Sequence, residues 1–388
     1  MKRFRFLLAY AFLALLFSCS RPGGLEPEPD RGPSLSEVTP ESVARILAKL
    51  PLEQENLREV YDAVSSSSTG GFDEEYLFSD LFLNPGTGVG AATKAPGSYS
   101  TPIRDLFVNY LENNVPTRAS DGGSMTVEEY VAALTESGMQ LYFPYHDEVE
   151  SGMLPVITFD PGYGAEKNYG YEMTVSADGT RKIEKVLVDE VMAKERPVWV
   201  VNTNDDSAFT PLEMYLGKAV KAGAFSCRPA ASKRKLMLKS FRMIRNYDSW
   251  FAGASEFKLQ IGSVDGFKAT TDAELALYRP AVTDLVIVVK RKDVDKDIEF
   301  DGLLMSDFTS QQERLAFLLT EDDGGTVTSW KCSATVKIQS KSYGFDIDLP
   351  YRDKDDIVWR GQLSADFFRE EDVVSARFGD TRLSFALE

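Results

Sequence analysis

Residues 330–338 read WKCSATVKI, a stretch in which polar side chains alternate with apolar or sulfur-containing ones. The members of the less polar set are Trp330, Cys332, Ala334, Val336 and Ile338. Successive side chains of a β-strand point to opposite faces of a sheet, so this set would share one face. The alternation therefore predicts a half-buried strand.

The same period continues through most of the chain after residue 233. Further alternating or apolar segments are residues 236–244, 257–261, 285–290, 315–319, 345–349, 357–363 and 383–387. Gly and Asp residues, which favour turns, separate these segments. Short strands in this number and spacing predict an antiparallel β-sandwich over residues 233–388.

Helical patterns come earlier in the chain. Thr39 precedes a proline and suits the N-cap of a helix, and Thr126 with Glu129 forms a capping box. We predict a small helical region over residues 37–138 and a mixed, β-rich region over residues 139–232. The whole chain is therefore predicted to be α+β and mainly β, with helices first and a sandwich last.

The N-terminus has the composition of an export signal. Three basic residues lie within the first five positions, and residues 6–17 are an unbroken apolar run. A helix needs about 20 residues to cross a bilayer, so this run favours a cleaved signal peptide at residues 1–18 over a permanent membrane span. Residues 19–36 are rich in Pro and Gly and predict a flexible linker.

The end of the apolar run, Leu16-Phe17-Ser18-Cys19, resembles the bacterial lipobox. The resemblance implies that the Cys19 thiol is diacylated and that Cys19 becomes the first residue after cleavage. Two or three acyl chains anchor a protein stably, whereas one gives only reversible binding. We expect a lipoprotein attached to the outer membrane through this lipid anchor, facing the periplasm or the cell surface.

Two further resemblances concern longer parts of the chain. The stretches at residues 71–76 and 197–202 are similar to those of Bacteroidota-type exported lipoproteins of uncharacterised function, a resemblance that implies location but no activity. The C-terminal part, with its acidic loops, loosely resembles C2-type β-sandwiches.

Composition excludes several classes of function. The chain has 388 residues, 43 of them Lys or Arg and 60 Asp or Glu, which gives a formal net charge of −17. An acidic protein lacks the clustered cations that nucleic acids require, so no nucleic-acid partner is expected. The single histidine, His146, excludes sites that need two imidazoles, and we expect a surface or hydrogen-bonded histidine there instead of a general base.

Two acidic loops are the candidate metal site. Their carboxylates belong to Asp322, Asp323, Asp353, Asp355 and Asp356. Ca²⁺ takes six to eight oxygen ligands in irregular geometry, so loops that converge at one end of a sandwich would suit it. The alternative is a set of solvated turns, in which Asp is a common residue. No other cofactor is expected.

One tryptophan and two cysteines are the remaining candidates. Trp250 has a loop context, which favours an exposed ring for a ligand, whereas the other tryptophans fall in apolar strand patterns. Cys227 and Cys332 form an even pair in an exported protein and suggest a disulfide. Two buried free thiols are the alternative.

No arrangement of nucleophile, base and orienting group is evident in the sequence. We therefore expect a non-catalytic binding or structural role in the cell envelope, with a protein or glycan as ligand. One alternative is a secreted hydrolase that uses paired carboxylates on glycans or peptides, since their separation cannot be read from a sequence. Another is a subunit of a surface filament or envelope complex.

Overall fold

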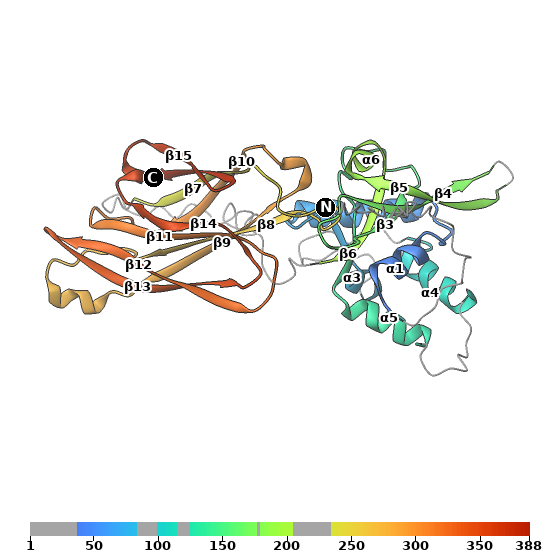
Figure 1. Ribbon diagram of the computed structural model, residues 1–388, viewed down its shortest axis with the longest axis horizontal. Helices are drawn as coiled ribbons and strands as arrows, with labels where there is room; N and C mark the ends of the chain where they lie inside the picture. The colour runs from blue at the N-terminus through green and yellow to red at the C-terminus, as the bar shows by residue number, and fades with distance from the viewer. Residues whose placement is uncertain (1–36, 84–98, 115–124, 177–178, 205–233) are drawn as a thin grey trace, which may run out of the picture.

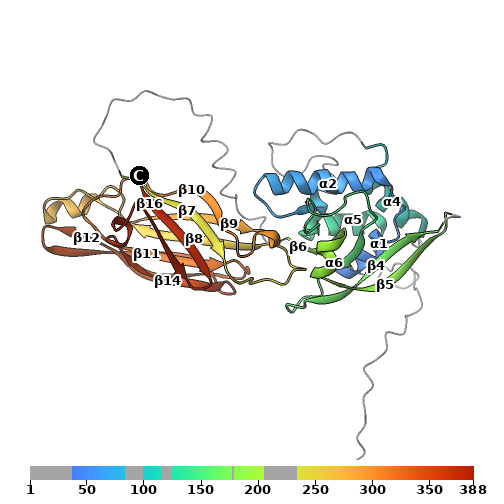
Figure 2. The ribbon, with the colours of Figure 1, turned by 90° about the horizontal axis from the view of Figure 1, so that it is seen from above.

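The computed structural model describes residues 37–83, 99–114, 125–176, 179–204 and 234–388. These residues form two lobes that lie end to end in an elongated body (Figures 1 and 2). The fold is α+β and mainly β, as predicted. None of the helices within the described ranges has the length and apolar composition needed to cross a bilayer.

The first lobe combines six helices with a six-stranded sheet. Its elements are α1 (Pro40–Leu47), α2 (Gln54–Thr69), β1 (Glu75–Leu77), α3 (Phe78–Leu83), α4 (Ile103–Asn114), α5 (Val127–Glu136), β2 (Met139–Tyr142), β3 (Val156–Phe159), β4 (Lys167–Val175), β5 (Arg181–Asp189), α6 (Glu190–Glu195) and β6 (Val198–Thr203). The strand order is β1-β2-β6-β3-β4-β5. Neighbouring strands are antiparallel except β3 and β6, which are parallel.

The predicted helix signals act as expected. The side chain of Thr39 accepts a hydrogen bond from the backbone N–H of Ser42, and Thr126 accepts one from Glu129 at 3.2 Å. The helices α1 to α5 pack on one face of the sheet in a single core that includes Trp199 of β6. The boundary expected at residue 138 therefore lies inside one lobe, because the helical and mixed regions share this core.

The opposite face of the sheet has its own core. It contains Val156, Val198 and Val200 from the strands and Ala193 from α6. The second lobe supplies Trp250 and Phe251 to this core.

The second lobe is built almost entirely of strands. Its elements are β7 (Leu236–Met243), β8 (Ser255–Ser263), η1 (Asp272–Leu277), β9 (Ala281–Val289), η2 (Arg291–Asp293), β10 (Ile298–Met305), β11 (Gln312–Glu321), β12 (Val327–Ile338), β13 (Lys341–Arg352), β14 (Asp356–Ser364), η3 (Phe367–Arg369), β15 (Val373–Phe378) and β16 (Thr381–Leu387). One sheet has the order β10-β7-β16-β15. The other has the order β13-β12-β11-β8-β9, with β14 paired to β11.

The β12–β13 hairpin folds over β8 and β11 of its own sheet, so the two sheets form three layers around two cores (Figure 1). In the middle layer, Phe317 and Leu319 of β11 face a core shared with the β7 sheet. Leu318, between them in sequence, faces a second core under the β12–β13 hairpin. The hairpin approaches β8 so closely that a Cβ added at Gly262 would lie 2.8 Å from Cδ1 of Ile347. The predicted sandwich therefore carries an additional layer.

The second core provides a test of this layering. Replacing the buried Leu318 by Ala leaves a cavity under the hairpin and is expected to lower the free energy of unfolding by about 2–5 kcal/mol. Leu303→Ala, the same change at a side chain that is 45% exposed, is expected to cost less than about 1 kcal/mol. Chemical denaturation measures both variants, and equal losses would contradict the three-layer arrangement.

Candidate functional site at the lobe junction

Residues 244–254, which join β7 to β8, form a docking segment that packs the second lobe against the first. Trp250 and Phe251 in this segment are fully buried, and their rings lie 3.9 Å apart between centroids. Both belong to the same core as Val198 and Val200 of β6. The indole Nε1 of Trp250 donates a hydrogen bond to the backbone oxygen of Glu166 at 3.0 Å. An aromatic pair from one lobe thus completes the core of the other.

Polar contacts with the backbone fix the same segment. Asn202 Nδ2 donates to the carbonyl oxygen of Phe251 at 3.0 Å, and Asp73 Oδ2 accepts from the backbone N–H of Ala254 at 3.0 Å. Gly253 has a φ of +131°, and a Cβ there would lie 2.8 Å from Asp73 Oδ2. Only glycine combines this backbone angle with so close an approach.

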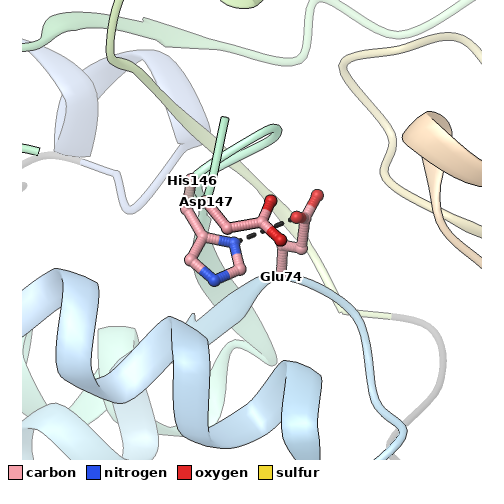
Figure 3. Close-up of side chains that lie close together, drawn as sticks. All are labelled: Glu74, His146 and Asp147. Atoms are coloured by element: carbon pink, nitrogen blue, oxygen red, sulfur yellow. Dashed lines mark hydrogen bonds and ion pairs between the residues drawn. The ribbon is translucent and has the colours of Figure 1, made fainter. Parts of the chain in front are cut away.

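The sole histidine lies beside this contact, in a cluster with two carboxylates (Figure 3). His146 Nδ1 is 3.0 Å from Oε1 of Glu74, and both side chains are buried. The pairing of β1 with β2 brings the two together, because Glu74 directly precedes β1 and His146 follows β2. The ligand atoms of Glu74, His146 and Asp147 all lie within 4.8 Å of one another.

The second lobe contributes a cation to this cluster. Lys292 of η2 lies with its Nζ 2.5 Å from Oδ2 of Asp147 and 4.0 Å from Oε1 of Glu74. Burial opposes ionisation of Asp147, but the hydrogen bond and charge of Lys292 outweigh burial, so the pKa of Asp147 lies below its ordinary value. The ion pair therefore persists in neutral and mildly acidic solution.

Arg291, the neighbour of Lys292, forms a second bridge between the lobes. Its Nη2 is 3.3 Å from Oε1 of Glu190, and its Nη1 donates to the backbone oxygen of Asp248 at 3.0 Å. Tyr145 also donates to Glu190, at 2.6 Å. Burial opposes ionisation of Glu190, but these partners outweigh burial and lower its pKa.

A third contact between the lobes joins Lys290 of the second lobe to Ser68 of α2. Lys290 Nζ donates to Oγ of Ser68 at 2.7 Å and to the backbone oxygen of Ser68 at 2.8 Å. Ser68 lies in the last turn of α2, where the helix dipole stabilises a cation. Lys290 therefore serves as a cap for this helix and as a link between the lobes.

A second group of carboxylates lies where the docking segment meets β8 and β11. The ligand oxygens of Asp248, Glu256 and Glu321 lie within 4.8 Å of one another, and Glu256 and Glu321 are only 3% and 1% exposed. Asp323 is close by: partial burial, followed by the negative charges of Asp248 and of the acidic loops, raises its pKa to about 6.

The two loops predicted to converge do lie together, and several of their carboxylates accept hydrogen bonds from within these loops. Asp322 Oδ1 accepts from Gly324 N at 2.9 Å and from Arg352 Nη1 at 3.2 Å. Asp353 Oδ1 accepts from the N–H of Thr326 at 2.7 Å. Asp355 and Asp356 are the other two predicted ligands.

Asp355 and Asp356 lie at the start of β14. Asp355 Oδ2 accepts from Arg352 N at 2.7 Å, while its buried Oδ1 has no hydrogen-bond partner among the described residues. Asp356 is opposite Glu321 in the β11–β14 register. The predicted loops therefore lie next to two buried carboxylates, those of Glu256 and Glu321, which were not among the predicted ligands.

The other predicted site residues have clear or partial outcomes. Trp250 is buried, so it has no exposed ring for a ligand and acts as the docking anchor. Cys332 is half-buried, its Sγ donates to the backbone oxygen of Ile347 at 3.5 Å, and burial followed by the charge of Asp348 raises its pKa to about 11. Cys227 and Cys19 lie outside the described residues, so the disulfide and the lipidation stay predictions.

Comparison of the chain with protein-family models, with curated proteins and with solved structures found no match in any of the three.

The docking anchor gives a prediction for the junction. Trp250→Ala removes the largest buried side chain of the contact and is expected to uncouple the lobes, at a cost of about 3–5 kcal/mol. Calorimetry should then show two separate unfolding transitions in place of coupled unfolding. Trp359→Ala, a change within the second lobe, should lower stability without separating the transitions, and a single coupled transition in the Trp250 variant would contradict the proposed role.

Proposed function

We propose that this protein is a lipoprotein anchored to the outer membrane through Cys19, with a non-catalytic binding or structural role in the cell envelope. The observation that supports a structural role most strongly is the lobe junction. Three consecutive basic side chains of the second lobe, Lys290, Arg291 and Lys292, each contact the first lobe. A body built in this way suits presentation of the surfaces of the two lobes in a fixed relation to each other.

The anchor is tested in cells by metabolic labelling with a palmitate analogue. We expect the wild type to incorporate the label and to sediment with the membrane fraction. Cys19→Ser removes the acylated thiol, so the label and most of the membrane association should be lost. Cys332→Ser serves as the matched control and should keep both. Equal labelling of the wild type and the Cys19 variant would contradict the anchor.

We also propose that the carboxylates of Asp248, Glu256 and Glu321 bind Ca²⁺. Asp248, Glu256 and Glu321 supply oxygen ligands within 4.8 Å of one another, and this hard cation prefers such ligands. Asp355, which is 9% exposed and has one oxygen without a hydrogen bond among the described residues, offers a further acceptor nearby. Asp248 belongs to the segment that carries Trp250, so a bound ion would tie this segment to β8 and β11.

Calcium binding is measured by calorimetric titration of the detergent-solubilised mature protein. Extracellular modules bind Ca²⁺ with dissociation constants of about 10⁻⁴–10⁻³ M, so heat is expected at millimolar metal. At 100 times the dissociation constant the ion should stabilise the fold by about 2.7 kcal/mol. Glu321→Gln should remove this effect and Glu299→Gln, at an exposed position, should retain it. No heat at millimolar Ca²⁺ would contradict the site.

One observation favours the hydrolase as a second candidate. A carboxyl group with a pKa of about 6, such as that of Asp323, has the property of a general acid near neutral pH. A turnover screen on glycans and peptides distinguishes the two functions. An activity that Asp323→Asn abolishes would establish the hydrolase, and its absence would favour the binding role.

A further inference from the structure

The cluster around the single histidine has the donor set of a transition-metal site. Glu74 and Asp147 offer carboxylate oxygens, and His146 offers an imidazole nitrogen. Zn²⁺ and similar ions bind such mixed nitrogen and oxygen ligands, whereas Ca²⁺ prefers oxygen alone. Three protein ligands leave one tetrahedral position open to water.

The distances suit an ion of this size. With bonds of about 2.0–2.2 Å, two ligand atoms of a tetrahedral zinc site lie about 3.3 Å apart. His146 Nδ1 and Glu74 Oε1 are already 3.0 Å apart, and the nearest ligand atom of Asp147 completes a group no wider than 4.8 Å. Small side-chain movements would therefore bring all three to bonding distance.

The surroundings hold two of the three ligands in place. Glu74 is fully buried, and its Oε2 accepts a hydrogen bond from the backbone N–H of Tyr145 at 3.2 Å. The imidazole of His146 lies edge-on to the rings of Tyr61 and Phe143, with centroids 5.5 Å and 6.2 Å away. Asp147 has a side chain that is 44% exposed, which gives the cluster access to solvent.

A positive charge already lies beside these carboxylates. Lys292 Nζ contacts Asp147 at 2.5 Å and lies 4.0 Å from Glu74. Two carboxylates so close together are stabilised by a cation, and an ammonium group and a metal ion compete for that role. Lys292 comes from the second lobe, so its displacement would also remove one contact of the junction.

We propose that Glu74, His146 and Asp147 bind a divalent transition-metal ion of the Zn²⁺ class, which takes this site in exchange for the ammonium group of Lys292. The proposal is independent of the lipid anchor and of the calcium cluster. It makes the junction responsive to metal, because the bound ion releases a side chain that otherwise links the lobes.

The composition of the chain makes the test specific. His146 is the only histidine among the 388 residues, so any imidazole–metal signal in an untagged protein comes from this site. The detergent-solubilised mature protein is titrated with Zn²⁺ by calorimetry and with Co²⁺ by absorption spectroscopy. We expect one ion per chain and the visible bands of cobalt in nitrogen and oxygen coordination. Intense sulfur-to-cobalt bands would instead place the ion on the cysteines and overturn the proposal.

Three variants separate the ligands from their competitor. His146→Asn and Asp147→Asn each remove one ligand and should weaken Zn²⁺ binding by about tenfold or more. The second of these changes a half-exposed side chain, so it tests the site even where the buried substitution prevents folding. Lys292→Met removes the competing charge and should tighten binding by about tenfold.

Glu321→Gln, in the other carboxylate cluster, is the matched control and should leave Zn²⁺ binding unchanged. Binding that survives the loss of both His146 and Asp147, or that does not respond to Lys292→Met, would overturn the exchange.

Discussion

The burial of Trp250 and Phe251 from the second lobe against the sheet of the first is the interaction on which the rest of the body depends. One face of that sheet is covered by α1 to α5, while the other relies on α6 and on this aromatic pair. Aromatic side chains bury large apolar areas, so the contact stabilises the docking of one lobe on the other. Asn202 donates a hydrogen bond to the backbone of the docking segment, and Asp73 accepts one from it. The indole of Trp250 donates to the backbone oxygen of Glu166, so both the backbone and the indole ring are fixed.

Charge is arranged around this apolar contact in a consistent way. The chain has an excess of acidic residues, and the junction gathers carboxylates from both lobes. On the side of the first lobe, Arg291 and Lys292 offset Glu190, Asp147 and Glu74. Near the docking segment, partial burial of Asp323, followed by the negative charges of Asp248 and of the acidic loops, raises the pKa of Asp323. The two clusters thus differ in kind: one contains the ammonium group of Lys292, which we propose a metal ion replaces, and the other consists of carboxylates alone.

The sequence predicts those elements whose signals are local. The alternation at residues 330–338 corresponds to β12, and the cap at Thr126 marks the start of α5. The short strand β1 was not predicted, because three residues carry too little period. The apolar run in β11 is typical of a strand buried on both faces, because such strands lose the alternation of polar and apolar residues. It therefore indicates the third layer. The junction had no local signal: His146 and Glu74 are 72 positions apart, Lys292 and Asp147 are 145 apart, and the loop context of Trp250 suggested exposure. Such sites form only when distant segments pack together.

The fixed relation between the two lobes is tested most directly by measuring a distance between them. Spin labels are placed at Val191→Cys on α6 and Leu303→Cys on β10, two exposed positions, with the native thiols of Cys227 and Cys332 replaced by serine. Double electron–electron resonance on the detergent-solubilised protein should then give one narrow distribution of distances. A broad distribution of distances, as expected for lobes that move independently, would contradict the fixed relation between them.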